Sequence, residues 1–120
     1  MHKNWPELAA GLNPALRELR AGTPEVMKGF SALARAALEA KALETKTKEL
    51  IALASAVALR CDACVAFHAE AAVKQGATRD EVMETMGMAV YMGGGPSLMY
   101  AADALAAFEE LAQPAPTVSG

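Results

Sequence analysis

The chain has 120 residues, of which 53% are hydrophobic and only 5% aromatic, and its formal net charge is −3 at pH 7. This length suits one domain with a sizeable core. The negative charge and the absence of a Lys/Arg cluster argue against a nucleic-acid-binding protein. No apolar run reaches the roughly 20 residues that span a bilayer, and the N-terminus lacks the apolar segment of a signal peptide. We therefore expect a cytoplasmic protein that binds neither nucleic acid nor membrane.

Helix signals are clear in the first half of the chain. The segment Thr23–Glu25 is typical of an N-cap followed by a first-turn proline and a first-turn acid. The periodic apolar residues after it predict an amphipathic helix that ends near Lys41. A second helix is expected to start around Thr45 to Thr47 and to run to about Arg60. Its stretch 50–59 is apolar on every side, which predicts a central, buried helix.

The second half continues with equally clear signals. A third helix carries both cysteines and is expected to end at Gly76, a residue suited to a left-handed cap. Thr78 and Glu81 form a capping box that starts a fourth helix. That helix must stop at the glycines and proline of 93–96, and a last helix is expected over 97–111. The methionines at helical spacing are expected to be adaptable core side chains; they are Met83, Met86, Met88, Met92 and Met99.

No segment has the alternating pattern of a strand, so the expected fold is all-α, a single-domain bundle of about five to six helices. We expect the domain to span residues 1–112 and residues 113–120 to form a disordered tail. Short helices can hardly cover this much apolar surface in a monomer, which predicts a homo-oligomer.

The two cysteines are the most informative residues. Cys61, Cys64 and His68 are three and four residues apart, which places them on one face of a helix. Two thiols that can form a disulfide, with a base one turn away, are the minimum equipment for redox chemistry. The dipole of a helix that begins near Cys61 favours that residue as the thiolate, whereas His68 as a general base favours Cys64. The residues leave this choice open.

Glu49 is the candidate acid that orients the histidine. If two helices form an antiparallel hairpin that turns near Arg60, Glu49 lies about 16 Å back along one helix and His68 about 12 Å forward along the other, at a rise of roughly 1.5 Å per residue. The two residues then lie at nearly the same level. A proton relay from Glu49 through a water to His68 and Cys64 is therefore feasible.

Glu49, eleven residues, Cys61-x-x-Cys64, three residues and His68 together resemble the active-site signature of a known family. This is the alkylhydroperoxidase D-like branch of the carboxymuconolactone decarboxylase family. The flanking segments 46–53, 76–78 and 91–96 fit as well, and the resemblance covers roughly residues 43–110.

The resemblance implies a thiol-dependent peroxidase with its active site on a helical hairpin. Cys64 would be the buried thiol that attacks the peroxide and becomes a sulfenic acid, and Cys61, more exposed, would resolve it into a disulfide. The reductant would be a dithiol such as dihydrolipoamide or a thioredoxin-like protein. The family also implies a hexamer for short single-unit chains, with a trimer as the alternative. One departure is Ala63, which stands where the best-studied pattern has a second histidine between the cysteines.

Two other functions are compatible with parts of the pattern. One is a non-enzymatic structural or zinc-binding oligomer. A zinc site could use both thiols, the imidazole and the carboxylate, but three ligands from one helix face are hard to arrange around one ion. Lactone decarboxylation is the other activity of the family, and its known enzymes do without the cysteine pair. We expect neither a metal nor an organic cofactor. A disulfide reductase without peroxidase activity remains an open alternative.

Overall fold

The computed structural model describes residues 3–113, and within that range it contains only helices and no strand. The helices are α1 (Trp5–Gly11), α2 (Asn13–Gly22), α3 (Pro24–Leu38), α4 (Thr45–Leu59), α5 (Asp62–Lys74) and α6 (Arg79–Ala112). The all-α prediction is therefore confirmed. The predicted tail lies, from residue 114 on, outside the described residues. No helix within 3–113 combines the length and hydropathy that a membrane-spanning segment needs.

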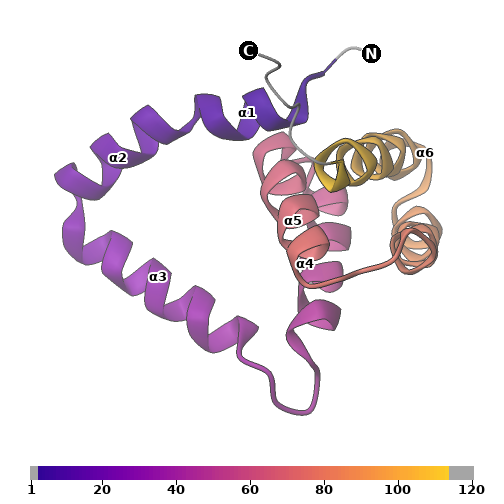
Figure 1. Cartoon of the computed structure of the whole chain (residues 1–120), viewed down its shortest axis with the longest axis horizontal. Coiled ribbons are helices and arrows are strands. Elements are labelled where there is room, and N and C mark those ends of the chain that lie inside the picture. Colours follow the sequence, from indigo (N-terminus) through magenta and orange to yellow (C-terminus); the bar gives the residue numbers. More distant parts are fainter. Residues whose placement is uncertain (1–2, 114–120) are drawn as a thin grey trace, which may run out of the picture.

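The body of the molecule is a bundle of α4, α5 and α6, with α1 packed across one end (Figure 1). Its core consists largely of small side chains from the three long helices, and Trp5 of α1 adds a large aromatic ring that is fully buried. Small residues let helix axes approach closely, which suits an alanine-rich sequence. The core is completed by Leu53, Val57, Val65 and Val82, all fully buried.

The helices α2 and α3 form an arm that leaves the body (Figure 1). Pro24 occupies the first turn of α3 as predicted, but the hydroxyl of Thr23 donates to the carbonyl of Leu19 at 2.8 Å and does not cap the helix. The helix ends at Leu38, three residues before the predicted Lys41. The larger difference is that neither α2 nor α3 contains a buried residue. No other part of residues 3–113 thus buries the apolar face of the amphipathic helix α3.

The prediction that α4 is buried on every side is wrong for one of its faces. Leu53 and Val57 are fully buried against α5 and α6, but Ile51 is 51% exposed and Leu59 is 78% exposed. The reason is geometric, because α5 and α6 cover only part of the circumference of α4. Most of the methionines predicted to lie in the core, all on α6, are exposed as well, and only Met86 of the five is buried.

The turns between the three long helices follow the sequence signals. Arg60 adopts the left-handed conformation (φ 56°) between α4 and α5, where the hairpin was expected to turn. Gly76 (φ 79°) follows α5, and Thr78 and Glu81 then form the predicted capping box at the start of α6. Gly94 has a non-helical backbone (φ 69°), which breaks α6 into two helical segments with different directions (Figure 1). The predicted break at the glycines is therefore confirmed.

Candidate functional site

The cysteine pair lies at the N-terminus of α5. Cys61 is the N-cap residue, and its sulfur accepts a hydrogen bond of 3.2 Å from the backbone N–H of Cys64. This contact follows from helix geometry, because an N-cap side chain faces the backbone of the third helical residue. The two sulfurs form a disulfide in this structure. The disulfide is therefore assembled by the local conformation of four consecutive residues.

The two cysteines differ in their surroundings more than in their exposure. Both are partly buried, although the family resemblance implied a buried Cys64 and a more exposed Cys61. Cys64 packs against the hydrophobic core, whereas the sulfur of Cys61 lies at the N-terminus of α5, where it accepts from the backbone N–H of Cys64. This position favours an anion at Cys61. The structure thus keeps the choice of attacking thiol open.

Glu49 and His68 meet directly across the α4–α5 hairpin. Glu49 Oε1 lies 2.8 Å from His68 Nδ1, a hydrogen-bond distance that leaves no room for the water expected between them. The side chain of Glu49 is only 8% exposed, and that of His68 is 34% exposed. Burying a carboxylate is costly unless it has a partner, and the imidazole supplies one. Glu49 and His68 therefore lie together, as their levels along the hairpin predicted, but they touch directly and not through a water.

The contact with Glu49 sets which nitrogen of the His68 ring carries the proton. When Nδ1 donates to the carboxylate of Glu49, the proton of the neutral ring is on Nδ1 and the lone pair is on Nε2. The ring is then held in the tautomer that can accept a proton from another group. A carboxylate in this position also stabilises the imidazolium that forms after proton transfer. Glu49 on α4 thus orients the imidazole of His68 on α5, the helix that begins at the cysteine pair.

An ion-pair cluster at the start of α5 was missed in the sequence. Lys3 Nζ lies 2.8 Å from a carboxylate oxygen of Asp62 and 3.1 Å from one of Asp103. Asp62 is the residue directly after Cys61, so the cluster adjoins the Cys61–Cys64 disulfide. Lys3 also lies over the rings of Trp5 and Tyr100, at 5.3 and 5.6 Å from their centroids. These contacts attach the N-terminal segment to the first turn of α5.

The charges of this cluster stabilise one another. The hydrogen bond from Lys3 is the main cause that lowers the pKa of Asp62, and Tyr100 also donates to this carboxylate. The same bond with Asp62 is the main cause that raises the pKa of Lys3. The pKa of the Tyr100 hydroxyl is raised, chiefly by its hydrogen bond to Asp62. Lys3 therefore offsets the negative charge of Asp62, the residue next to Cys61.

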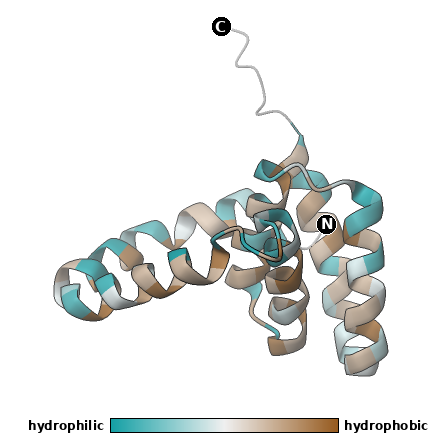
Figure 2. Cartoon of the chain, turned by 90° about the horizontal axis from the view of Figure 1, so that it is seen from below, coloured by the Kyte–Doolittle hydropathy of each residue, from teal (hydrophilic) through white to brown (hydrophobic). Residues whose placement is uncertain are grey.

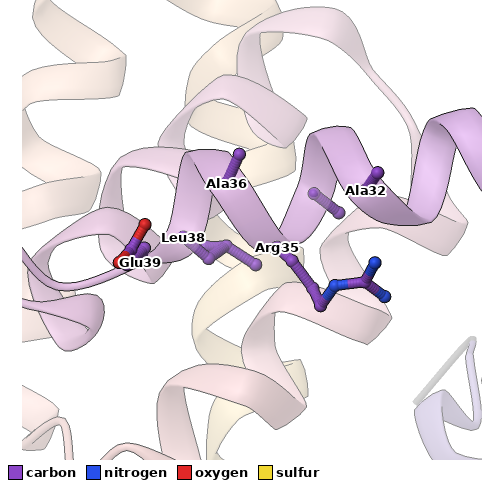
Figure 3. Close-up of a pocket in the computed structure, with 6 residues that line it drawn as sticks. Ala32, Arg35, Ala36, Leu38 and Glu39 are labelled. Atoms are coloured by element: carbon purple, nitrogen blue, oxygen red, sulfur yellow. The ribbon is translucent and has the colours of Figure 1, made fainter.

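The hollow along α3 lies apart from the cysteines, and no metal-binding group is found among the described residues. A hollow of about 690 Å³ lies along the C-terminal part of α3 and is lined by Ala32, Ala34, Arg35, Ala36, Leu38 and Glu39 (Figure 3). It holds no cysteine or histidine, so it is separate from the redox pair. Among residues 3–113, no group of three or more His, Cys, Asp or Glu side chains is arranged to hold a metal ion. The zinc alternative thus gains no support from the geometry.

The chain is similar to proteins of one family. The sequence profile of the carboxymuconolactone decarboxylase family matches residues 24–107. An uncharacterised protein of Cupriavidus necator is 40% identical over 100 residues, which cover 83% of this chain and 88% of that protein. A Paracoccus denitrificans protein, named uncharacterised protein 4 in the cox locus, is 33% identical over 97 residues, which cover 81% and 87%.

Solved structures agree with this assignment. A carboxymuconolactone decarboxylase family protein of Legionella pneumophila, crystallised in its apo form, is 54% identical with a TM-score of 0.89, and the match covers 91% of this chain and 97% of that one. A family protein of Thermotoga maritima, suggested to be involved in an antioxidative response, is 30% identical with a TM-score of 0.76 and coverages of 86% and 88%. On both its sequence and its fold, the chain belongs to the carboxymuconolactone decarboxylase family.

Proposed function

We propose that this protein is a thiol-dependent peroxidase or disulfide oxidoreductase that reduces hydroperoxides through Cys61 and Cys64. The observation that carries the proposal is the combination of a Cys61–Cys64 disulfide with a Glu49–His68 pair on the same helical hairpin. A thiol that attacks a peroxide must lose a proton, and the oxidised product must be stable enough to await a reductant. In this proposal His68 accepts the thiol proton, and Cys61 converts the oxidised Cys64 into a stable disulfide.

The proposed reaction begins with His68 accepting the proton of the Cys64 thiol. The thiolate attacks one oxygen of the hydroperoxide, the O–O bond breaks, and the leaving alkoxide takes up the proton that His68 had accepted. Cys64 becomes a sulfenic acid. The thiol of Cys61 then displaces water from the Cys64 sulfur and forms the disulfide. The peroxide has gained two electrons, and the cysteine pair has lost them.

Reduction of the disulfide completes the cycle. We propose a dithiol reductant, dihydrolipoamide or a thioredoxin-like protein, that attacks the disulfide and leaves as a disulfide itself. Cys61 would form the mixed disulfide, and Cys64 would leave as a thiolate. The suggested antioxidative role of the Thermotoga relative, which is 30% identical, is consistent with this assignment.

Lactone decarboxylation is the competing activity because the family is named for it. That reaction needs no cysteine pair, so an assay with the Cys61→Ser, Cys64→Ser double variant separates the two functions. Retained turnover of a carboxylactone by the double variant would favour the decarboxylase. Loss of all peroxide consumption in the same variant is the result that the redox proposal requires.

The direct test is intact-mass spectrometry of the reduced, metal-free protein before and after one equivalent of an organic hydroperoxide. We expect a loss of two hydrogens per chain, with peptide mapping to Cys61–Cys64. The chain has only these two cysteines, so the single variants are unambiguous. Cys64→Ser should not react, whereas Cys61→Ser should complete one turnover and stop as a sulfenic acid. An unchanged mass in the unmodified protein, or continued turnover by both single variants, would refute the mechanism.

A further inference from the structure

The arm formed by α2 and α3 lacks the contacts that would hold it in place. Within the described residues it meets α1 and α4 at its two ends and makes no contact with α5 or α6 (Figure 1). None of its side chains is buried. A helix of the length of α3, 15 residues, is only marginally stable in water by itself. The arm therefore needs another surface to pack against.

The uncovered side of α3 is an apolar stripe. Val26, Phe30 and Leu33 follow one another at helix spacings of four and three, and each is more than 60% exposed. Lys28 and Arg35 lie on the opposite side of the helix. The arm projects from the body with apolar and polar residues alternating along its ribbon (Figure 2). This is the pattern of a helix that binds a hydrophobic groove, with anchors at i, i+4 and i+7.

A groove of matching character lies between α4 and α6. Its volume is about 460 Å³, and no charged side chain lines it. Its apolar lining comes from Leu50, Ile51, Ala54, Ala58, Met88 and Met92. A small-molecule site of this size has convergent polar groups that fix the ligand, and this groove offers only the hydroxyls of three side chains. Flexible methionines instead suit the irregular surface of a partner helix.

The arm cannot fill the groove of its own chain in this arrangement. It leaves on the far side of α4 and α5 from α6 (Figure 1). Two hydrogen bonds fix the angle at which it leaves: Thr45 Oγ1 donates to the carbonyl of Leu38 at 2.9 Å, and Lys48 Nζ donates to the carbonyl of Glu39 at 2.6 Å. Each copy thus presents one apolar arm and one apolar groove. A second copy of the chain offers both in equal number.

We propose that α3 of one copy lies in the α4–α6 groove of a second copy, with Phe30 as the central anchor. A closed, symmetric assembly leaves no arm and no groove uncovered, which accounts for apolar surfaces that one chain leaves exposed. Ile51 and Met88, exposed in one chain, become buried beneath the arm of the neighbour. This proposal depends only on the surfaces and is independent of the redox reaction.

Sedimentation of two single variants tests the anchor. Phe30→Glu places a charge in the apolar contact, and it should raise the dissociation constant of the oligomer by about 30-fold or more, as expected for a central interface residue. Lys28→Glu places the same side chain on the polar face of α3 and should leave assembly unchanged. A monomeric unmodified protein, or equal assembly of Phe30→Glu and the unmodified protein, would overturn the proposal.

Cross-linking tests which surfaces meet. In a Cys61→Ser, Cys64→Ser background, a copy with Phe30→Cys is mixed with a copy with Met88→Cys and then oxidised. We expect a covalent dimer that contains one copy of each, because the two positions face each other across the proposed contact. Replacing the first copy by Lys28→Cys should abolish this product. Absence of the mixed dimer from the Phe30 and Met88 pair would show that α3 does not occupy the groove.

Discussion

Replacing Glu49 by Gln tests the role of the carboxylate that faces His68. The variant keeps the size and shape of the side chain but removes its charge, and its amide nitrogen can donate to Nδ1 and hold the ring in the other tautomer. The lone pair of the ring would then be on Nδ1, so Nε2 could no longer accept a proton from Cys64. We therefore expect slower oxidation of Cys64 in a protein that remains folded.

The size of the effect follows from the contact. A carboxylate and an imidazolium whose charges are about 4 Å apart interact by about 4 kcal/mol at an effective dielectric constant of about 20. Glu49 is almost fully buried, but the imidazole is 34% exposed, and solvent weakens the interaction. A remaining effect of about 3 kcal/mol corresponds to a rate lower by about 10²-fold.

The assay is the rate at which the reduced protein is oxidised by a hydroperoxide at neutral pH, measured by quenching with an alkylating reagent and intact-mass spectrometry. Glu44→Gln is the matched control because Glu44 precedes the same helix and its side chain is 66% exposed. His68→Ala should slow the reaction similarly, and the Glu49→Gln, His68→Ala double variant should be no slower than the slower single variant. A folded Glu49→Gln protein within about threefold of the unmodified rate, or fully additive effects, would refute the reasoning.

Two further predictions concern stability. Leu53 is fully buried at the centre of the α4–α5–α6 core. Leu53→Ala should therefore lower the free energy of unfolding, measured by urea denaturation, by about 2 to 5 kcal/mol. A smaller loss would show that the core adjusts to the cavity. Lys3→Met should cost about 1 kcal/mol at neutral pH because both members of the Lys3–Asp62 pair are partly solvated. Because the pKa of Asp62 is lowered in the folded protein, its carboxylate stabilises the fold above the ordinary pKa of 3.8, and this stabilisation is lost as the pH falls through the lowered pKa. Because the pKa of Lys3 is raised, its ammonium stabilises the fold below 10.5, and this stabilisation is lost as the pH rises through the raised pKa. Urea denaturation at pH 7 and pH 3 should therefore show a difference between Lys3→Met and the unmodified protein that shrinks at the lower pH, and an unchanged difference would contradict the assignment.

Local features of the structure could be predicted from the sequence because their causes lie within a few residues. The capping box of Thr78 and Glu81 needs only residues three apart, and it is present as expected. Cys61 caps α5 because its sulfur faces the N–H of Cys64, three residues on. The spacing from Glu49 to His68 gave their common level along the hairpin, since an α-helix has a fixed rise per residue. What the spacing could not give was the rotation of the two helices, which decides that the side chains meet directly.

Contacts between distant segments needed the tertiary structure. Lys3 and Asp103 are 100 residues apart, and no spacing in the sequence relates them to Asp62, although an acid beside the first cysteine could have prompted a search for a cation. Periodicity also shows which residues can share a face but not whether another helix covers that face. For this reason Ile51 and Leu59 were expected to be buried, and the apolar side of α3 was not recognised as uncovered.

The sequence by itself therefore determined the helices from α3 onward to within a few residues, and the helical spacing of the four candidate residues, because hydrogen bonding and helix periodicity act over one or two turns. The tertiary structure alone decided that Glu49 touches His68, that Lys3 joins the start of α5, and that the arm leaves the body. These features depend on how helices that are far apart in sequence rotate and pack, and that arrangement is a property of the whole core.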